Sequence, residues 1–171
     1  GFQEYKTRSS HGHYNQGWKD AGDAIVHADG SIPPLPIALC ELQGYVYDAK
    51  LRLADIYELL GRPEAAERLR AEASQLFERV NNDFWWDAEG PYVLGLGGRK
   101  QAIRSVASNA GHLLASGIVP AGRAGSIVRR LMADDMWSGW GIRTLSSDHP
   151  AYNPFSYHTG TVWPHDNHEQ P

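Results

Sequence analysis

The chain has 171 residues, of which 42% are hydrophobic and 21% are charged, and its formal net charge is −4. This composition is typical of one globular domain rather than of a disordered segment. The acidic balance provides no general basic surface for nucleic acid, and no apolar run is long enough to cross a bilayer, so we expect neither as a partner.

The first part of the chain predicts a long polar loop followed by a helical hairpin. Residues 1–36 are rich in Gly, Ser, His and Pro and show no sustained hydrophobic period. After Pro36 apolar residues recur at helical spacing, at Leu42, Val46, Ala49, Leu53, Ile56 and Leu60. Gly61 suits the left-handed position after a helix and Pro63 the first turn of the next. The second helix has an apolar face of Ala66, Leu69, Ala73, Leu76 and Val80, and so short a turn makes the pair antiparallel.

Further helices are expected in the second half of the chain. After Phe84-Trp-Trp-Asp we expect a small β-hairpin or an extended segment near 91–98. A helix is predicted over Ser105–Ser116, another begins at Pro120, and a fifth begins near Thr161. The face of the Pro120 helix that should point inward comprises Ala124, Ile127, Val128 and Leu131. The prediction is an all-α fold of helical hairpins with long loops. The hairpins share no repeat of about 34 residues, which argues against a tetratricopeptide array.

Residues 137–167 are the stretch that points most clearly to a site. They hold three of the six Trp and three of the eight His, yet they show no hydrophobic periodicity. Aromatic faces among short polar side chains on irregular backbone favour a site built from loops on a rigid scaffold. Sugars require this mixture, because their apolar ring faces stack on aromatic rings and their hydroxyls need polar partners. The alternative is a Trp-rich loop that fills a core.

Two carboxylates near the start of the chain are candidates for acid chemistry. Asp20 and Asp23 lie three residues apart, directly after Trp18 and Lys19. A carboxyl group held against a Trp in a desolvated pocket has a raised pKa, which suits a general acid. The alternative is that one of them caps a turn or pairs with Lys19.

Polar residues inside the predicted helices are candidates for lining a cleft. Asn109 and His112 lie three apart on one predicted helical face, although a hydrogen-bonded core histidine is equally compatible with the pattern. Glu41 and Gln43 lie near the start of the first helix, where a pocket on the loop side would be. Arg143 is the most credible cationic anchor for a carboxylate or a sugar hydroxyl.

The His-rich end of the chain raises the question of a metal. His158, His165, Asp166 and His168 are ordinary ligand types for zinc. Their spacing fits no helical zinc signature, and the neighbours His165 and Asp166 would point apart on a helix. We therefore expect no metal and no cofactor. Hydrogen bonds to a polar ligand, or a buried network, are expected for His158 and Asp166.

The single cysteine and the start of the chain bear on its cellular context. Cys40 cannot form an internal disulfide and lies in an apolar helical pattern, which predicts a small buried hydrophobe in a reducing compartment. With no secretory signal pattern at the start, we expect a cytoplasmic protein. The chain begins at Gly1 within a polar segment, which predicts a piece of a larger polypeptide.

Five sequence blocks, taken in order, resemble a known family. They read QGWKDAGD (16–23), IALCELQGYVY (37–47), SNAGH (108–112), GWGIRTL (139–145) and YNPFSYHTGTVWPHDN (152–167). Together they are similar to the bacterial amylo-α-1,6-glucosidase, or glycogen-debranching-enzyme-like, proteins, from about Gly12 to Asn167. That family implies an (α/α)6 barrel, in which helical hairpins surround a funnel and the loops at one end form the sugar site.

The resemblance implies inverting hydrolysis of α-1,6 glucosidic linkages in an oligo- or polysaccharide. A general acid protonates the leaving oxygen and a general base activates water, with about 6.5–9.5 Å between the two carboxyl groups. The acid falls at Asp20, with Asp23 as a sugar ligand or as the acid itself. The pocket would be lined by Trp18, Trp140, Arg143, Tyr157, His158, Trp163 and Asp166, in addition to Glu41, Gln43, Asn109 and His112.

Two departures from the family pattern limit what this chain does alone. A full barrel needs more helices than the four or five predicted here, so we expect residues 1–171 to be a single partial catalytic domain. The general base would come from a loop near the final helices, and Glu169, the only late Glu, is not assigned to that role. The chain is then expected to be inactive alone. It would also expose helix faces that favour self-association.

Other functions remain open at the level of sequence. One is a carbohydrate-binding or helical interaction module without catalysis, and another is a metal-dependent hydrolase. Mannosidase, trehalase and glucoamylase-like enzymes share the barrel and the pairing of a Trp with an acid. Fold-level analogy does not choose among them, and neither the sugar nor the linkage can be read from the sequence.

Overall fold

The computed structural model of the chain describes residues 1–86 and 92–168. Its elements are β1 (Ala38–Leu39), α1 (Cys40–Leu59), α2 (Pro63–Asp83), β2 (Gly95–Leu96), β3 (Ala102–Ile103), a 3-10 helix (Ser108–Ala110), α3 (His112–Ser116), α4 (Ala121–Leu131) and α5 (Pro164–His168). The described residues are thus mostly helical with one small sheet. None of their helices has the length and apolar character needed to span a membrane.

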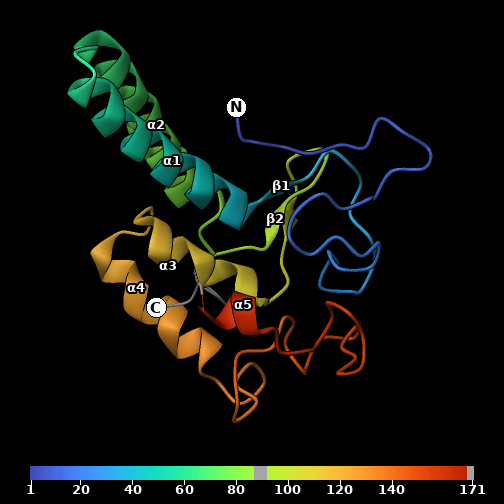
Figure 1. Ribbon diagram of the computed structural model, residues 1–171. Helices are drawn as coiled ribbons and strands as arrows, with labels where there is room; N and C mark the ends of the chain where they lie inside the picture. The colour runs from blue at the N-terminus through green and yellow to red at the C-terminus, as the bar shows by residue number, and fades with distance from the viewer. Residues whose placement is uncertain (87–91, 169–171) are drawn as a thin grey trace.

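The predicted hairpin of α1 and α2 is confirmed, and it extends away from the rest of the molecule (Figure 1). Gly61 has a φ of +70°, the left-handed geometry expected after the first helix, and Pro63 opens α2. The apolar face predicted for α1 is not buried along its whole length. Ile56 is 51% exposed and Leu60 is 66% exposed, because the end of the hairpin that carries them stands away from the other described elements (Figure 1).

A three-stranded antiparallel sheet corrects the all-α prediction. The strand order is β1-β2-β3, with Ala38 opposite Leu96 and Gly95 opposite Ile103. Glycine is required at position 95, where β2 pairs with β1, since a Cβ atom there would lie 2.7 Å from the Ala38 carbonyl oxygen. The hairpin expected near 91–98 therefore lies later in the chain than predicted. Residues 87–91 are outside the described part.

The predicted helix over Ser105–Ser116 is wrong in its first half. Residues 105–107 are extended, because the Ser105 hydroxyl donates to the Val26 carbonyl at 2.6 Å and Ala107 forms a β-bridge with Leu145. These long-range partners displace the local helical preference. In α4, Ile127 and Leu131 are buried as predicted, but Val128 is 46% exposed.

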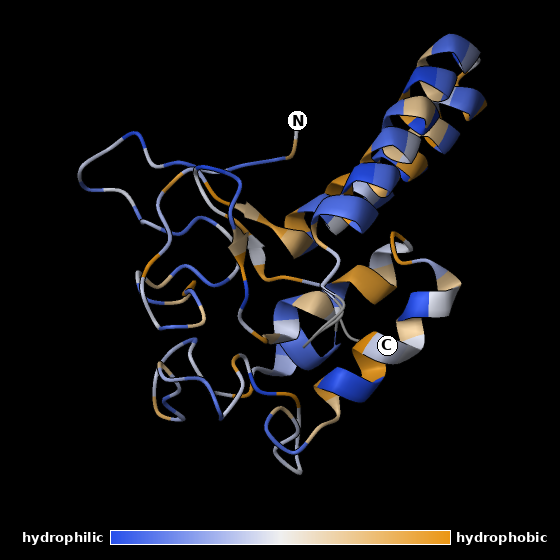
Figure 2. Ribbon diagram, turned by 180° about the vertical axis from the view of Figure 1, so that it is seen from behind, coloured by the Kyte–Doolittle hydropathy of each residue, from blue (hydrophilic) through white to orange (hydrophobic). Residues whose placement is uncertain are grey.

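Two hydrophobic clusters give the body of the molecule its shape. The first lies beneath the helices, with Phe84, Leu113, Ile127 and Met136 among its buried residues. The second joins the N-terminal loop to the sheet and to the loop after α4, and its buried residues include Ile25, Ile37, Leu39, Ile103 and Leu145. Figure 2 shows apolar ribbon segments at the sheet and at the helices beside it, whereas the long loops are mostly polar. The N-terminal loop and the loop after α4 therefore both pack on the same sheet.

Candidate functional site

The site is built where the N-terminal loop meets the aromatic stretch 137–167. The N-terminal segment owes its local shape to Asn15, which is fully buried. Its side-chain oxygen accepts a hydrogen bond from the Tyr5 hydroxyl at 2.8 Å, and its amide group donates to the Ala21 carbonyl at 2.7 Å. Asn15 thereby closes the loop that carries Trp18, Lys19 and Asp20.

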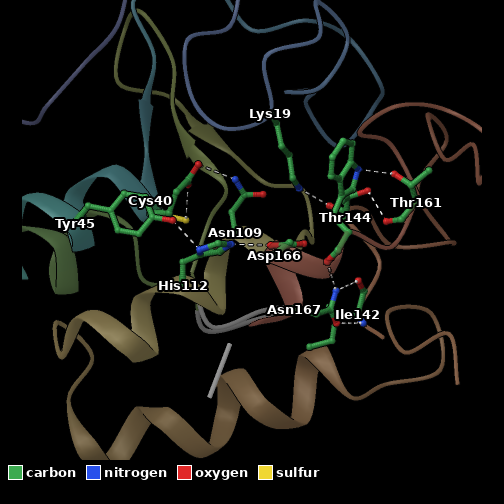
Figure 3. A network of polar contacts seen from close by, with 12 residues as sticks. Lys19, Cys40, Tyr45, Asn109, His112, Ile142, Thr144, Thr161, Asp166 and Asn167 are labelled. Atoms are coloured by element: carbon green, nitrogen blue, oxygen red, sulfur yellow. Dashed lines mark hydrogen bonds and ion pairs between the residues drawn. The ribbon is translucent and has the colours of Figure 1, made fainter. Parts of the chain in front are cut away.

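Lys19 joins this loop to the aromatic stretch. Its side chain is 1% exposed, and its amine donates a hydrogen bond to the Thr144 carbonyl at 2.6 Å (Figure 3). The amine also lies 5.0 Å from the centroid of the Trp18 ring. Sequence analysis did not single out Lys19, because a lysine in a polar loop is ordinarily solvated.

Aromatic rings from both segments form one cluster. The Trp18 ring centroid lies 4.8 Å from that of His165 and 5.5 Å from that of His158. The Trp163 ring lies 5.4 Å from His158 and 4.9 Å from Tyr157. The structure therefore brings together four of the predicted sugar-binding residues, Trp18, Tyr157, His158 and Trp163. We refer to these four with His165 as the ring cluster.

Asp20 lies at the edge of the ring cluster. Its Oδ1 atom is 4.0 Å from Nδ1 of His158, and its side chain is 50% exposed, while Asp23 is exposed. His158 itself is only 2% exposed, and this burial lowers its pKa. The arrangement places an accessible carboxyl group beside aromatic faces.

A buried polar network, shown in Figure 3, adjoins the ring cluster, and the ring centroid of its member His112 lies 6.0 Å from that of Trp18. Glu41 accepts a hydrogen bond from Asn109 at 2.8 Å, and His112 contacts Asp166 at 2.7 Å and the Tyr45 hydroxyl at 2.6 Å. Burial raises the pKa of Glu41. Glu41, Asn109, His112 and Asp166 are all at most 2% exposed, so in this structure they support the site from below rather than line its surface.

Two other predicted sugar ligands lie apart from the ring cluster. Gln43 is fully buried, and its amide exchanges two hydrogen bonds of 2.9 Å with the backbone of Gln3, which gives it a structural role. Trp140 is 94% exposed and lines a separate hollow of about 350 Å³ between α4 and the loop that follows it. Neither position could be predicted, because the sequence does not show which distant segment each side chain contacts.

Several buried polar atoms near the site have no hydrogen-bond partner among the described residues. They include Nε1 of Trp18, Nη1 of Arg143 and Oδ1 of Asn109. Arg143 uses its Nε atom on the Tyr152 hydroxyl at 3.3 Å. Unpaired buried polar atoms are costly, and a polar ligand would supply an acceptor for the Trp18 and Arg143 donors.

The described residues contain no group of three or more His, Cys, Asp and Glu side chains arranged to hold a metal ion. In the predicted His-rich segment the side chains have different neighbours. Asp166 contacts His112, while the His165 ring packs against Trp18 and Trp163.

Because of Lys19, the free energy of unfolding is expected to depend on pH in the alkaline range. Burial lowers its pKa from 10.5 to about 8, against the opposing effect of Asp166, Glu41 and Cys40. Between these two pKa values the unfolded chain binds the additional proton, so this contribution to the free energy of unfolding rises with pH. The free energy of unfolding, measured by urea denaturation, should rise more from pH 8 to pH 10 for the native chain than for Lys19→Met. Parallel curves would contradict the assignment. The neighbour His158 has a pKa below this window and does not add to the difference.

The chain is similar to a family of glycoside hydrolase domains. Residues 7–168 match the family described as the mannosylglycerate hydrolase MGH1-like glycoside hydrolase domain. Among solved structures, a protein titled "Sialidase" aligns with a TM-score of 0.74 and 18% identity, over 95% of this chain and 15% of that one. Neutral trehalase Nth1 from Saccharomyces cerevisiae aligns with a TM-score of 0.62 and 14% identity, over 85% of this chain and 28% of that one. Comparison with curated proteins gave no match.

At these identities the two structural matches show a shared fold, and the chain spans less than a third of either structure. The family match is of a different kind, since it extends over nearly the whole sequence, including Trp18, Asp20 and the ring cluster. The chain therefore belongs to the mannosylglycerate hydrolase MGH1-like glycoside hydrolase domain family.

Proposed function

We propose that this chain is the acid-bearing part of an (α/α)6 glycosidase, with Asp20 as the general acid. The observation that carries the proposal is the position of the Asp20 carboxyl group, 4.0 Å from His158 at the edge of the ring cluster. Its half-exposed side chain is accessible to a leaving oxygen, while the aromatic faces beside it suit a sugar ring. Asp23, three residues later and exposed, is the second candidate for the acid.

The mechanism that we propose is inversion with a general base supplied from outside residues 1–171. An inverting enzyme needs a second carboxyl group about 6.5–9.5 Å from the acid to activate water. The remaining carboxylates near the ring cluster, Glu41 and Asp166, are buried and engaged with Asn109 and His112. They are therefore poorly placed to activate a water molecule. The chain spans only 15% and 28% of the two matched structures, which supports a base that lies outside residues 1–171.

Two substrate classes follow from different lines of support. The five sequence blocks favour α-1,6 glucosidic branch points, whereas the family description favours a glycoside of the mannosylglycerate type. Both would place a sugar ring on Trp18 and Trp163. The unpaired Nη1 of Arg143 would suit a sugar hydroxyl in the first class and a carboxylate in the second.

Sugar binding by the purified chain tests the proposal directly. Calorimetric titration with isomaltose, mannosylglycerate and trehalose should show binding of one of them, and Trp163→Ala should weaken it about tenfold or more, given the area that a Trp contributes. Trp140→Ala is the matched control and should leave the affinity unchanged. Binding by none of these sugars would count against the proposal. Binding that is unchanged in Asp20→Ala, together with inactivity of the complete protein, would favour a carbohydrate-binding module.

We also propose that the chain self-associates through the exposed end of the α1–α2 hairpin. Leu53, Ile56, Leu59 and Leu60 are all more than 40% exposed there, and Leu59 reaches 88%. Adjacent exposed apolar side chains favour association. Sedimentation velocity should detect oligomers of the native chain that Ile56→Glu with Leu59→Glu converts to monomers. A native chain that is monomeric at high concentration would contradict this.

A further inference from the structure

The buried amine of Lys19 has no role in the acid chemistry proposed above. Its two neighbours in the sequence, Trp18 and Asp20, both have one. Trp18 contributes a ring to the ring cluster, and Asp20 carries the acid. Lys19 is 1% exposed, whereas the Asp20 side chain is 50% exposed. The two neighbouring side chains therefore leave the backbone toward opposite environments, one into the interior and one toward solvent.

The partner of Lys19 is itself the centre of the aromatic stretch. Thr144 is fully buried, and its backbone N–H and its hydroxyl both donate to the Thr161 carbonyl, at 2.9 and 3.0 Å. The Gly160 N–H donates to the Thr144 hydroxyl at 2.9 Å. Thr144 thus fixes the segment that presents Tyr157, His158 and Trp163. A bond to its carbonyl connects the acid-bearing loop with the backbone that holds the rings.

The contacts that Asp20 and Ala21 make with the aromatic stretch are longer, and farther along the N-terminal loop the His27 carbonyl oxygen lies 3.0 Å from Nε2 of His149. The Ala21 N–H lies 3.5 Å from Nδ1 of His158, and the Asp20 carboxyl group lies 4.0 Å from the same atom. A charged donor at 2.6 Å from a carbonyl makes a stronger bond than either of these. Lys19 therefore makes the shortest polar contact between the acid-bearing loop and the segment that holds the rings.

A buried ammonium group needs compensating charge, and the structure supplies it. Glu41 at the start of α1 and Asp166 in α5 are both buried carboxylates that favour the protonated amine. An apolar side chain of similar length, such as Met, would fill the space but would not make the bond to the Thr144 carbonyl.

We propose that Lys19 is a positioning residue, an inference that rests on the glycosidase function proposed above. Its amine holds the Trp18–Asp20 segment against Thr144 and so sets the place of the Asp20 carboxyl group beside the sugar-binding rings.

Fluorine NMR of the chain labelled with 5-fluorotryptophan tests the inference together with sugar titration. In Lys19→Met the Trp18 and Trp163 resonances should shift and broaden, whereas those of Trp85 and Trp140, which lie elsewhere in the fold, should keep their positions. The affinity for the sugar that the native chain binds should fall about tenfold or more, since the lost bond has a charged donor. The matched control is Lys50→Met, which removes an ion pair with Glu72 on the α1–α2 hairpin and should change neither readout.

A second variant covers the case in which Lys19→Met does not fold. Lys19→Met with Glu41→Gln removes one uncompensated carboxylate as well as the amine, so the core is closer to neutral, but the bond to Thr144 is still absent. It should give the same selective change at Trp18 and Trp163. Unchanged Trp18 and Trp163 resonances with native affinity would overturn the inference alone, and so would an equal change at all six tryptophans. If the native chain binds none of the sugars, the proposed function fails first and the positioning role fails with it.

Discussion

Replacing Asp20 with Asn is expected to lower the rate of glycoside hydrolysis by the complete protein about 10²–10⁴-fold, the range for loss of a general acid. The substitution preserves the size of the side chain but removes the proton that the leaving oxygen needs. Because Asp20 is half exposed at the edge of the ring cluster, sugar affinity and folding should change little. The measurement is kcat on an unactivated glycoside beside a calorimetric affinity.

The leaving group provides a sharper test of the same role. A glycoside with a good leaving group, such as a nitrophenyl glycoside, needs little protonation, so Asp20→Asn should slow its hydrolysis much less than that of an alkyl glycoside. Asp23→Asn is the matched comparison, and it should slow the hydrolysis of the two glycosides by the same factor. If Asp23→Asn shows the dependence on leaving group and Asp20→Asn does not, the acid is Asp23. Robust turnover by residues 1–171 alone would contradict the missing base.

Replacing Asp166 with Ala is expected to lower the free energy of unfolding by about 3–5 kcal/mol, the cost of removing one partner from a buried pair. Asp166 is fully buried, contacts His112 at 2.7 Å and offsets the charge of Lys19. Its loss would leave both of these groups buried with less compensation. Urea denaturation of the native and variant chains measures the difference.

Two variants make the interpretation of Asp166→Ala specific. Asp166→Asn keeps an acceptor for His112 but removes the charge, so its loss of stability should be smaller. Asp48→Asn breaks an ion pair with Arg52 on α1 whose arginine is largely exposed, and it should change stability little. If Asp48→Asn lowered the free energy of unfolding as much as Asp166→Ala does, the burial of Asp166 would not explain its effect on stability.

The helical hairpin of α1 and α2 could be predicted from the sequence because its determinants are local. The spacing of apolar residues, Gly61 and Pro63 all act within one or two turns of the chain. The start of α4 was predictable for the same reason, whereas α5 begins at Pro164, after the predicted start near Thr161. The three-stranded sheet was not, because β1 and β2 are separated by the whole hairpin and each has only two residues.

The candidate site shows the same division. The residue types of the ring cluster and the Trp-Lys-Asp segment pointed to a sugar-binding glycosidase, and the family match supports the broad assignment. Which candidates lie at the surface could not be predicted. Glu41, Asn109 and His112 face one another beneath the rings, Gln43 holds the N-terminal segment, and Trp140 lies in another hollow.

The sequence by itself determined the helical hairpin, the types of side chain available for sugar chemistry and the placing of the Asp20 and Asp23 carboxyl groups shortly after Trp18. Those properties depend on residues close together in the chain. Only the tertiary structure decided that Lys19 is buried and that it reaches Thr144, 125 residues away. The burial of a charged side chain depends on partners from α1 and α5, and no local pattern around residue 19 specifies them.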